Sequence, residues 1–495
     1  MTAPMRWRIV RPVSLNILYR VYTTNMKLAW KSQTLSNYRS LIRLELSRCT
    51  VYTPANSKSR VEKLTEENQY KNLSDVVTPL EHRPYNDQLK TKEFLMRRAL
   101  KKIYNTIKDH RRGSTPQLDE IANQSDGQIC PFIEVKPSPV IYGYRNKNSV
   151  NFGKDVNGNE KTVGYSIGKY KDQNMVYAKP YLLPNISDQH KNIIKSVEDY
   201  IRQSCFHADS SRYGIWRSAI IRSTKRGEIM LWFVLNPYSL SQEELEHAKN
   251  ELKDYYSNGP GILVGVTSLY LQVCKGFTPR LGNTETIHLS GTEYITEELN
   301  GKKFIIAPES FFQVNTTAAE VLFKTIGELL VEKSTSNLLD VGCGTGTIGI
   351  LLSDYVSHVY GIDVMPSAIE CAKENAKLND IKNIEFLCGM AHTTLKQMIE
   401  DNHSGLRLDN MGAILNPGRV GLNKKFIYAL RNCPEVKHII YVSCKPAGNA
   451  LRNIVDLLVP EDEIIQGKCF RAEKALAVDM FPHTRHCELV ISLVR

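Results

Sequence analysis

Residues 337–346 read NLLDVGCGTG, and this stretch decides the fold of the chain. Its apolar first half is typical of a short buried strand, and the apolar residues 348–352 behind it predict the start of a helix. Glycines at such a junction let the backbone turn sharply and approach a ligand closely, with the helix N-terminus pointing at that ligand. The stretch therefore predicts a ligand-binding loop in an α/β fold.

A second acidic residue ends the next predicted strand, residues 358–363. Asp363 lies 19 positions after Gly344 (363 − 344 = 19), a separation at which a carboxylate reaches ribose hydroxyls. An NAD site would have the same spacing. The order of strand, DxGxGxG loop, helix, strand and acid resembles the class I S-adenosylmethionine methyltransferases more than the dehydrogenases. That resemblance implies that Asp340 lies near the methionine portion of the cofactor and that Asp363 binds its ribose.

Helical and strand-like segments alternate through the rest of the C-terminal half. We expect a helix at residues 368–378 and strands at 384–388, 412–415 and 439–443, an alternation that predicts a doubly wound parallel sheet. Cys444 directly follows the last of these strands, and ligands bind at the carboxyl ends of the strands in such sheets. A lone cysteine is more often an inert buried thiol. The position of this one makes it a candidate nucleophile.

Length, hydropathy and cysteine spacing limit the class of protein. A chain of 495 residues is expected to form two or three domains. The longest apolar run, residues 229–235, is far shorter than the roughly 18 residues needed to cross a bilayer, so we expect no membrane segment. The 11 cysteines include no close CxxC pair, which argues against a disulfide framework and against a zinc or iron–sulfur site.

The N-terminal segment is strongly basic. Residues 1–44 contain eight Lys or Arg residues and no acid, so they account for +8 of the formal net charge of +12. An amphipathic, Arg-rich leader without acids is typical of a mitochondrial transit peptide, which predicts localisation in the mitochondrial matrix. A disordered basic arm that binds nucleic acid directly is the alternative.

The remaining chain divides into three predicted parts. Residues 45–129 are expected to form a polar linker that contains a basic helix at 87–112, and residues 130–290 an α+β domain for which residues 143–147, described next, predict RNA binding. Residues 291–495 form the α/β catalytic domain, with the Rossmann-like fold that the glycine loop and the alternating elements predict.

The central domain offers helix signals and one candidate RNA-binding cluster. Ser187 and Ser241 are expected to begin helices, and Ser241 with Glu244 has the spacing of a capping box. Residues 143–147, GYRNK, place an aromatic ring beside two cations, a composition suited to stacking a base and contacting phosphate. Such clusters also occur at ordinary strand edges. We hypothesise that Tyr144 and its basic neighbours contact RNA.

Five motifs in the C-terminal half occur in the order found in one enzyme family. They are SFFQVN at 310–315, GCGTG at 342–346, NPGRVGL at 416–422, YVSCKP at 441–446 and DMFPHTRHCE at 479–488. In these motifs the chain resembles the RNA uracil-5-methyltransferases, most closely their tRNA branch, and with its basic leader it is most similar to the mitochondrial members. The resemblance is strong from about residue 280 to the end, weaker at 130–150 and absent before that.

The resemblance assigns roles to the matching residues. It implies S-adenosylmethionine as the cofactor, Cys444 as the nucleophile and Glu488 as the general base. The residues that it places around the cofactor are Gln313, Gly342, Thr347, Asp363 and Asn416. It implies no metal ion, and no obligate protein partner is expected.

Two positions depart from the family pattern. Asn416 stands where the family usually has an aspartate, so the carboxylate expected beside cofactor and base is an amide, which carries no charge and cannot accept a proton. This change bears on the turnover rate more than on the fold. Lys445 stands where asparagine is common, and a cation beside Cys444 would favour its thiolate.

The function implied by the resemblance is methylation of carbon 5 of a uridine in mitochondrial tRNA. The target would be a T-loop uridine, converted into 5-methyluridine through a covalent adduct between Cys444 and carbon 6, with Glu488 as the base. Mitochondrial ribosomal RNA is an alternative substrate for the same chemistry. An alternative from another class is a weakened enzyme that acts as an RNA-binding or RNA-folding factor, because Asn416 replaces a carboxylate.

Overall fold

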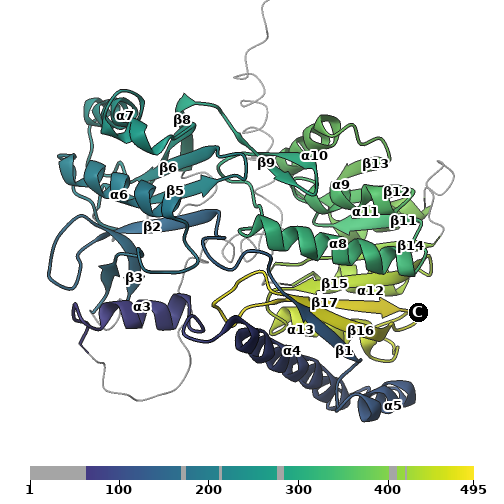
Figure 1. Cartoon of the computed structure of the whole chain (residues 1–495). Helices are drawn as coiled ribbons and strands as arrows, with labels where there is room; N and C mark the ends of the chain where they lie inside the picture. The colour runs from purple at the N-terminus through teal and green to yellow at the C-terminus, as the bar shows by residue number, and fades with distance from the viewer. Residues whose placement is uncertain (1–62, 169–173, 211–213, 276–283, 401–409, 419–420) are drawn as a thin grey trace, which may run out of the picture. The chain divides into compact units, whose positions relative to one another are not determined.

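The computed structural model describes residues 63–495 except 169–173, 211–213, 276–283, 401–409 and 419–420 (Figure 1). The predicted transit peptide, residues 1–44, and Arg419 of the NPGRVGL motif lie outside the described residues.

The C-terminal half is built on an eight-stranded sheet with the order β1-β16-β17-β15-β14-β11-β12-β13. Within it β17 runs antiparallel to its neighbours β15 and β16, and the other pairings are parallel. The strands are β1 (Phe132–Lys136), β11 (Asn337–Val341), β12 (His358–Asp363), β13 (Ile384–Cys388), β14 (Met411–Leu415), β15 (Val436–Ser443), β16 (Arg471–Val478) and β17 (Glu488–Val494). The predicted doubly wound sheet is confirmed, with an antiparallel strand inserted near one edge.

Helices cover both faces of this sheet. Successive side chains of each strand point to opposite faces, and here both faces are apolar and need to be covered. In β15, Ile439 and Tyr441 pack into one hydrophobic cluster with α11 (Ala391–Glu400), α12 (Lys424–Arg431) and α13 (Asn449–Leu458). Ile440 and Val442 pack into a second cluster with α8 (Thr316–Glu332), α9 (Thr347–Leu352) and α10 (Pro366–Leu378). A strand whose successive side chains enter two apolar layers is buried on both sides, which explains the apolar run at residues 439–442.

The predicted linker contains structure that belongs to the catalytic core. Its helix, α4 (Tyr85–Lys108), confirms the predicted helical pattern, and α4 contacts α13 and β1. Leu100, Ile103 and Ile107 of α4 are fully buried in the same cluster as α12 and α13. Two shorter helices, α3 (Gln69–Val77) and α5 (Pro116–Gln124), flank α4. The expectation of a linker was therefore wrong for this segment, because α4 packs against α13, which lies more than 300 residues further along the chain.

The central region forms a seven-stranded sheet with the order β4-β3-β2-β5-β6-β7-β8. Its elements are β2 (Lys147–Gly153), β3 (Thr162–Ile167), β4 (Val176–Ala178), α6 (Asp188–Gln203), β5 (Trp216–Ser223), β6 (Ile229–Leu235), α7 (Gln242–Ser257), the 3₁₀ helix η2 (Pro260–Val264), β7 (Ser268–Cys274) and β8 (Thr284–Gly291). The Ser241 capping box is present, and the Ser187 side chain caps α6. A hairpin, β9 (Ile295–Leu299) and β10 (Lys302–Ile306), and the short helix η3 (Ser353–Tyr355) complete the described elements.

One strand crosses the predicted boundary between domains. We assigned residues 130–290 to the central domain, but β1 pairs in parallel with β16, with Phe132 opposite Ala475 and Lys136 opposite Val478. The chain thus contributes a strand to the catalytic sheet before it forms the central sheet. A short alternating segment carries no sign of which sheet it joins, because pairing is set by contacts distant in sequence.

Candidate active site

The glycine loop joins β11 to α9 in backbone conformations that favour glycine. Gly342, Gly344 and Gly346 have φ angles of 72°, 55° and 78°, in the left-handed region that other residues rarely adopt. The N–H groups of Gly342 and Cys343 both donate to the carbonyl of Ile362 in β12, at 2.8 and 3.0 Å. These contacts fix the loop at the carboxyl ends of β11 and β12.

Two aspartates hold the loop and the helix that follows it. Asp363 accepts the Gly344 N–H through Oδ2 at 3.0 Å and the Met365 N–H through Oδ1 at 2.9 Å. A carboxylate offers about four lone-pair positions, so Asp363 can still accept from ribose hydroxyls. Asp340 is buried and accepts the Gly349 N–H of α9 at 2.9 Å, and burial raises the pKa of its carboxyl to about 7. Asp340 therefore supports the start of α9 rather than facing the crevice.

The loop borders the open space that a bound cofactor requires. A Cβ atom added at Gly342 or Gly344 would meet nothing within 4 Å, whereas one at Gly346 would lie 2.8 Å from the Phe386 ring and 3.0 Å from the Ala372 methyl group. Thr347, the first residue of α9, lies half-buried beside this loop. The first two glycines thus face free space and the third packs against protein, an arrangement that fits an adenosyl cofactor.

Alanine substitutions should separate these two roles. For Gly344→Ala we expect only backbone strain of about 1–2 kcal/mol, together with a roughly tenfold weaker affinity for S-adenosylmethionine, equivalent to about 1.4 kcal/mol. Gly346→Ala should lose more stability, because overpacking adds about 1–3 kcal/mol to the strain. Denaturant unfolding and equilibrium dialysis check the pair. Equal losses of stability, or unchanged cofactor affinity in Gly344→Ala, would contradict this division.

Sheet register brings the predicted nucleophile and base together. The last pair between β15 and β17 is Ser443 opposite Leu489, so the next positions on the two strands are Cys444 and Glu488. Glu488 is also opposite Val478, the last residue of β16. Directly opposite residues in an antiparallel pair have Cα atoms only about 4.5–5.5 Å apart. Cys444, directly after β15, and Glu488, the first residue of β17, are therefore neighbours at one edge of the sheet.

The same edge carries the cofactor loop and Asn416. The neighbouring parallel strands β11, β14 and β15 are followed directly by Gly342, Asn416 and Cys444. The register of the three strands shows that their carboxyl ends lie side by side, because Leu415 of β14 lies opposite both Val341 of β11 and Tyr441 of β15. Carboxyl ends of adjacent parallel strands form the ligand crevice of an open sheet. The structure thus brings Gly342, Asn416, Cys444 and Glu488 to one edge, where Asp363 at the end of β12 also lies.

Of Cys343, Cys444 and Cys487, which adjoin β11, β15 and β17, Cys444 is the best suited to act as a nucleophile. Cys343 and Cys487 are 6% and 1% exposed, and burial raises the pKa of both thiols well above the usual value. Cys487 also donates its S–H to the Val478 carbonyl at 3.1 Å. Cys444 is partly exposed. Because the thiolate is the reactive form, burial disfavours Cys343 and Cys487.

Gln313 lies in a segment fixed by the central sheet. Asn146 donates its side-chain N–H to the Gln313 carbonyl at 3.0 Å. Arg222, 1% exposed, donates to the carbonyls of Ser310 and Phe312, each at 2.9 Å, and burial lowers the pKa of its guanidinium to about 10. Sequence reasoning missed Asn146 and Arg222 as supporting residues. The available signal was a basic residue within the apolar strand β5.

The proposed RNA-stacking role of Tyr144 was wrong. Its ring is 8% exposed and its hydroxyl donates to the Pro482 carbonyl at 3.0 Å, so the ring has no free face for a base. Lys147 of the same cluster lies over the Trp232 ring, with Nζ 5.2 Å from the ring centroid. Phe311 of the SFFQVN motif is instead 75% exposed. Burial, which a single sequence does not reveal, decides which aromatic residue is available.

Within the described residues we find no group of three or more His, Cys, Asp or Glu side chains arranged to hold a metal ion. The same part of the chain has no helix that combines the length and the apolar character of a bilayer span.

The fold and the site define an S-adenosylmethionine-dependent methyltransferase. A family model described as a methyltransferase domain matches residues 332–456. The chain is also similar in fold to the crystal structure of Pyrococcus abyssi tRNA (uracil-54, C5)-methyltransferase in complex with S-adenosyl-L-homocysteine. The TM-score is 0.58 at 24% identity, and the match covers 84% of this chain and 85% of that one.

Curated relatives identify the family within this class. The chain is 37% identical over 434 residues to mouse tRNA (uracil-5-)-methyltransferase homolog B, which covers 86% of this chain and 85% of the mouse protein. It is 37% identical over 453 residues to the zebrafish (Danio rerio) homolog B, with coverage of 90% and 92%. Mouse homolog A is 38% identical over 426 residues, with coverage of 86% and 69%. The chain belongs to the tRNA (uracil-5-)-methyltransferase family.

Proposed function

We propose that this enzyme methylates the T-loop uridine of mitochondrial tRNA through a covalent intermediate on Cys444, with Glu488 as the base. The observation that carries the proposal is the register of β15 and β17, which places Cys444 beside Glu488 at the edge that holds the glycine loop. Uracil carbon 5 is a weak nucleophile, so catalysis by a covalent adduct is the plausible route.

Cys444 and Glu488 divide the chemistry between them. The Cys444 thiolate forms a bond to carbon 6, and the electrons of the carbon 5–carbon 6 double bond move into the uracil ring as an enolate. When bound, S-adenosylmethionine supplies an electrophilic methyl group to carbon 5. Glu488 then takes the proton from carbon 5, the double bond re-forms and the Cys444 thiolate leaves. Asn416 lies at the same edge, but its amide cannot accept this proton, whereas the carboxylate of Glu488 can.

The target base has to leave its stack to reach this edge, as in other enzymes that modify bases. Phe311 offers an exposed aromatic surface next to Gln313, and aromatic rings stack single bases. Arg485 and His486, exposed in the segment just before Glu488, can contact phosphate. These features support an RNA substrate whose target loop is held close to Cys444.

Mapping of a labelled methyl group tests the substrate. The full chain is incubated with methyl-labelled S-adenosylmethionine and mitochondrial tRNA or ribosomal RNA transcripts, and the labelled nucleotide is located. We expect label on one T-loop uridine of tRNA, lost when that uridine is changed to cytidine. Label on ribosomal RNA alone would replace the substrate assignment, and RNA binding without label would favour the binding-factor alternative.

The mitochondrial assignment rests on the composition of residues 1–44. Fused to a fluorescent protein, this segment should direct it to the matrix, and a version with its basic residues changed to glutamine should not. A fusion that stays outside mitochondria would contradict the assignment.

A further inference from the structure

The segment that connects β16 to β17, residues 479–487, leads directly into Glu488, the first residue of β17. Its two ends follow Val478 and precede Glu488, which are paired opposite each other. We call these residues the base loop. Hairpin connections usually contain about 2–5 residues, so this longer loop needs contacts outside the hairpin to hold one conformation.

Other parts of the chain supply those contacts to four successive carbonyl groups. The donors are Asn315 Nδ2 to the Met480 carbonyl at 3.1 Å, Lys92 Nζ to Phe481 at 3.0 Å, the Tyr144 hydroxyl to Pro482 at 3.0 Å and the Leu80 N–H to His483 at 2.9 Å. Because buried carbonyl groups require partners, these donors fix the path of the base loop residue by residue.

Helix α4 makes the charged contact. Lys92 forms an ion pair with Asp479 in which both side chains are 0% exposed. The other carboxylate oxygen of Asp479 accepts from the Tyr85 hydroxyl at 3.1 Å, and Oδ1 also accepts the Phe481 N–H at 3.0 Å. Asp479 is the first residue of the base loop, so this pair holds the point where the loop leaves β16.

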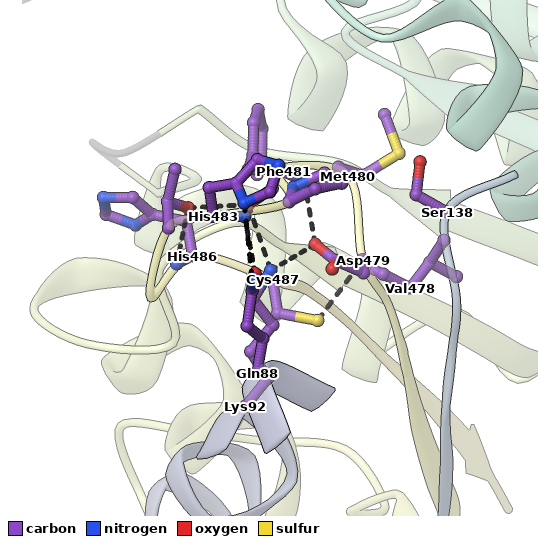
Figure 2. A network of polar contacts seen from close by, with 12 residues as sticks. Gln88, Lys92, Ser138, Val478, Asp479, Met480, Phe481, His483, His486 and Cys487 are labelled. Atoms are coloured by element: carbon purple, nitrogen blue, oxygen red, sulfur yellow. Dashed lines mark hydrogen bonds and ion pairs between the residues drawn. The ribbon is translucent and has the colours of Figure 1, made fainter. Parts of the chain in front are cut away.

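One helical turn before Lys92, Gln88 holds the middle of the base loop. Its Oε1 accepts the His483 N–H at 2.7 Å, and its Nε2 lies 3.3 Å from His483 Nδ1. Gln88 and Lys92 share one face of α4, as residues four apart do, and Figure 2 shows both reaching from the helix into the loop. His483 adopts a φ of 67°, an uncommon conformation for a residue with a side chain.

A buried ion pair is a poor way to gain stability. Desolvation of two charges often cancels their attraction, and apolar replacements of similar volume are often as stable. The Lys92–Asp479 pair is therefore weak evidence for a gain in stability, whereas its position joins α4 to the start of the base loop.

We infer that α4 is a positioning element for the catalytic base, in which Lys92 acts through Asp479 and Gln88 acts through His483 to aim Glu488 at the adduct on Cys444. The inference rests on the proposed function of Glu488. Lys92 and Gln88 touch the base loop rather than the reacting atoms, so they are positioning residues. Misplacement of a catalytic group by about 1 Å can cost roughly a hundredfold in rate.

The test separates formation of the adduct from its release. Adduct formation on RNA containing 5-fluorouridine requires Cys444 but no proton removal, whereas turnover on ordinary RNA requires Glu488. In Lys92→Met combined with Asp479→Asn, both buried charges are removed, and the amide oxygen of the new side chain can still accept the Phe481 N–H. We expect 5-fluorouridine adduct formation within about threefold of the parent, turnover roughly 10- to 100-fold slower, and a covalent enzyme–RNA complex visible on denaturing gels with ordinary RNA.

A second variant and two controls keep the test decisive. Gln88→Met removes only neutral contacts and should also slow turnover while leaving 5-fluorouridine adduct formation close to the parent level. This variant provides the test if the double variant does not fold. Lys102→Met removes an exposed charge from the same helix and should leave turnover at saturating RNA unchanged. A parallel loss of adduct formation and turnover, or no loss of either, would overturn the inference. Glu488→Gln is the reference variant. Normal turnover in Glu488→Gln would refute the base assignment itself. Stalled release in Glu488→Gln together with normal turnover in the α4 variants would refute only the positioning role.

Discussion

In Cys444→Ala we expect no covalent complex with RNA containing 5-fluorouridine, and methylation of ordinary tRNA at least about a thousandfold below the parent rate. The reason is that carbon 5 becomes nucleophilic only after the thiolate has added to carbon 6. Gel electrophoresis under denaturing conditions detects the complex, and label from S-adenosylmethionine measures the rate. The variant should bind the cofactor normally, because Cys444 does not belong to the glycine loop.

Cys205→Ala is the matched control, since Cys205 is an exposed thiol of the central region, away from the strand ends of the catalytic sheet. It should form the complex as the parent does. If Cys444→Ala forms the complex equally well, the nucleophile has been assigned to the wrong residue.

In Glu488→Gln we expect the methyl group to be transferred but the enzyme to remain attached to its RNA. An amide cannot take the carbon 5 proton, so expulsion of Cys444 stalls. Loss of a general base typically costs a factor of about 10²–10⁴, and we expect a reduction of this size in multiple turnover. A covalent enzyme–RNA complex containing the labelled methyl group should accumulate with ordinary tRNA.

The control for this variant is Glu473→Gln on the neighbouring strand β16, where the acid pairs with Lys333 instead of lying at the active edge. Its turnover should stay close to that of the parent. Normal multiple turnover in Glu488→Gln would show that another group removes the proton.

Local sequence signals predicted the local structure well. The glycine loop requires left-handed conformations at Gly342, Gly344 and Gly346, and only glycine adopts these readily, so the loop could be identified from residue types alone. The capping box at Ser241 is equally local, since both of its hydrogen bonds join residues three positions apart. Where the structural cause lies within a few residues, one sequence is sufficient.

Features that depend on distant pairing could not be predicted in this way. The polar stretch around α4 gave no sign that Lys92 meets Asp479, and β1 gave no sign that it joins β16. From the sequence, only a resemblance linked Cys444 with Glu488. The structure adds that the antiparallel register of β15 and β17 makes the two residues neighbours. Tyr144 was misjudged because its chemical type suits stacking while its burial prevents it.

The ion pair between α4 and the base loop joins an early part of the chain to one of its last parts. Its two members are 387 positions apart, and the lysine is synthesised first. Until Asp479 has been synthesised, Lys92 lacks its partner, and the contact between them also has to overcome the entropy of closing a long stretch of chain. Glu488 lies still further along the chain than Asp479, so under the proposed mechanism only the finished protein carries the group that releases the RNA.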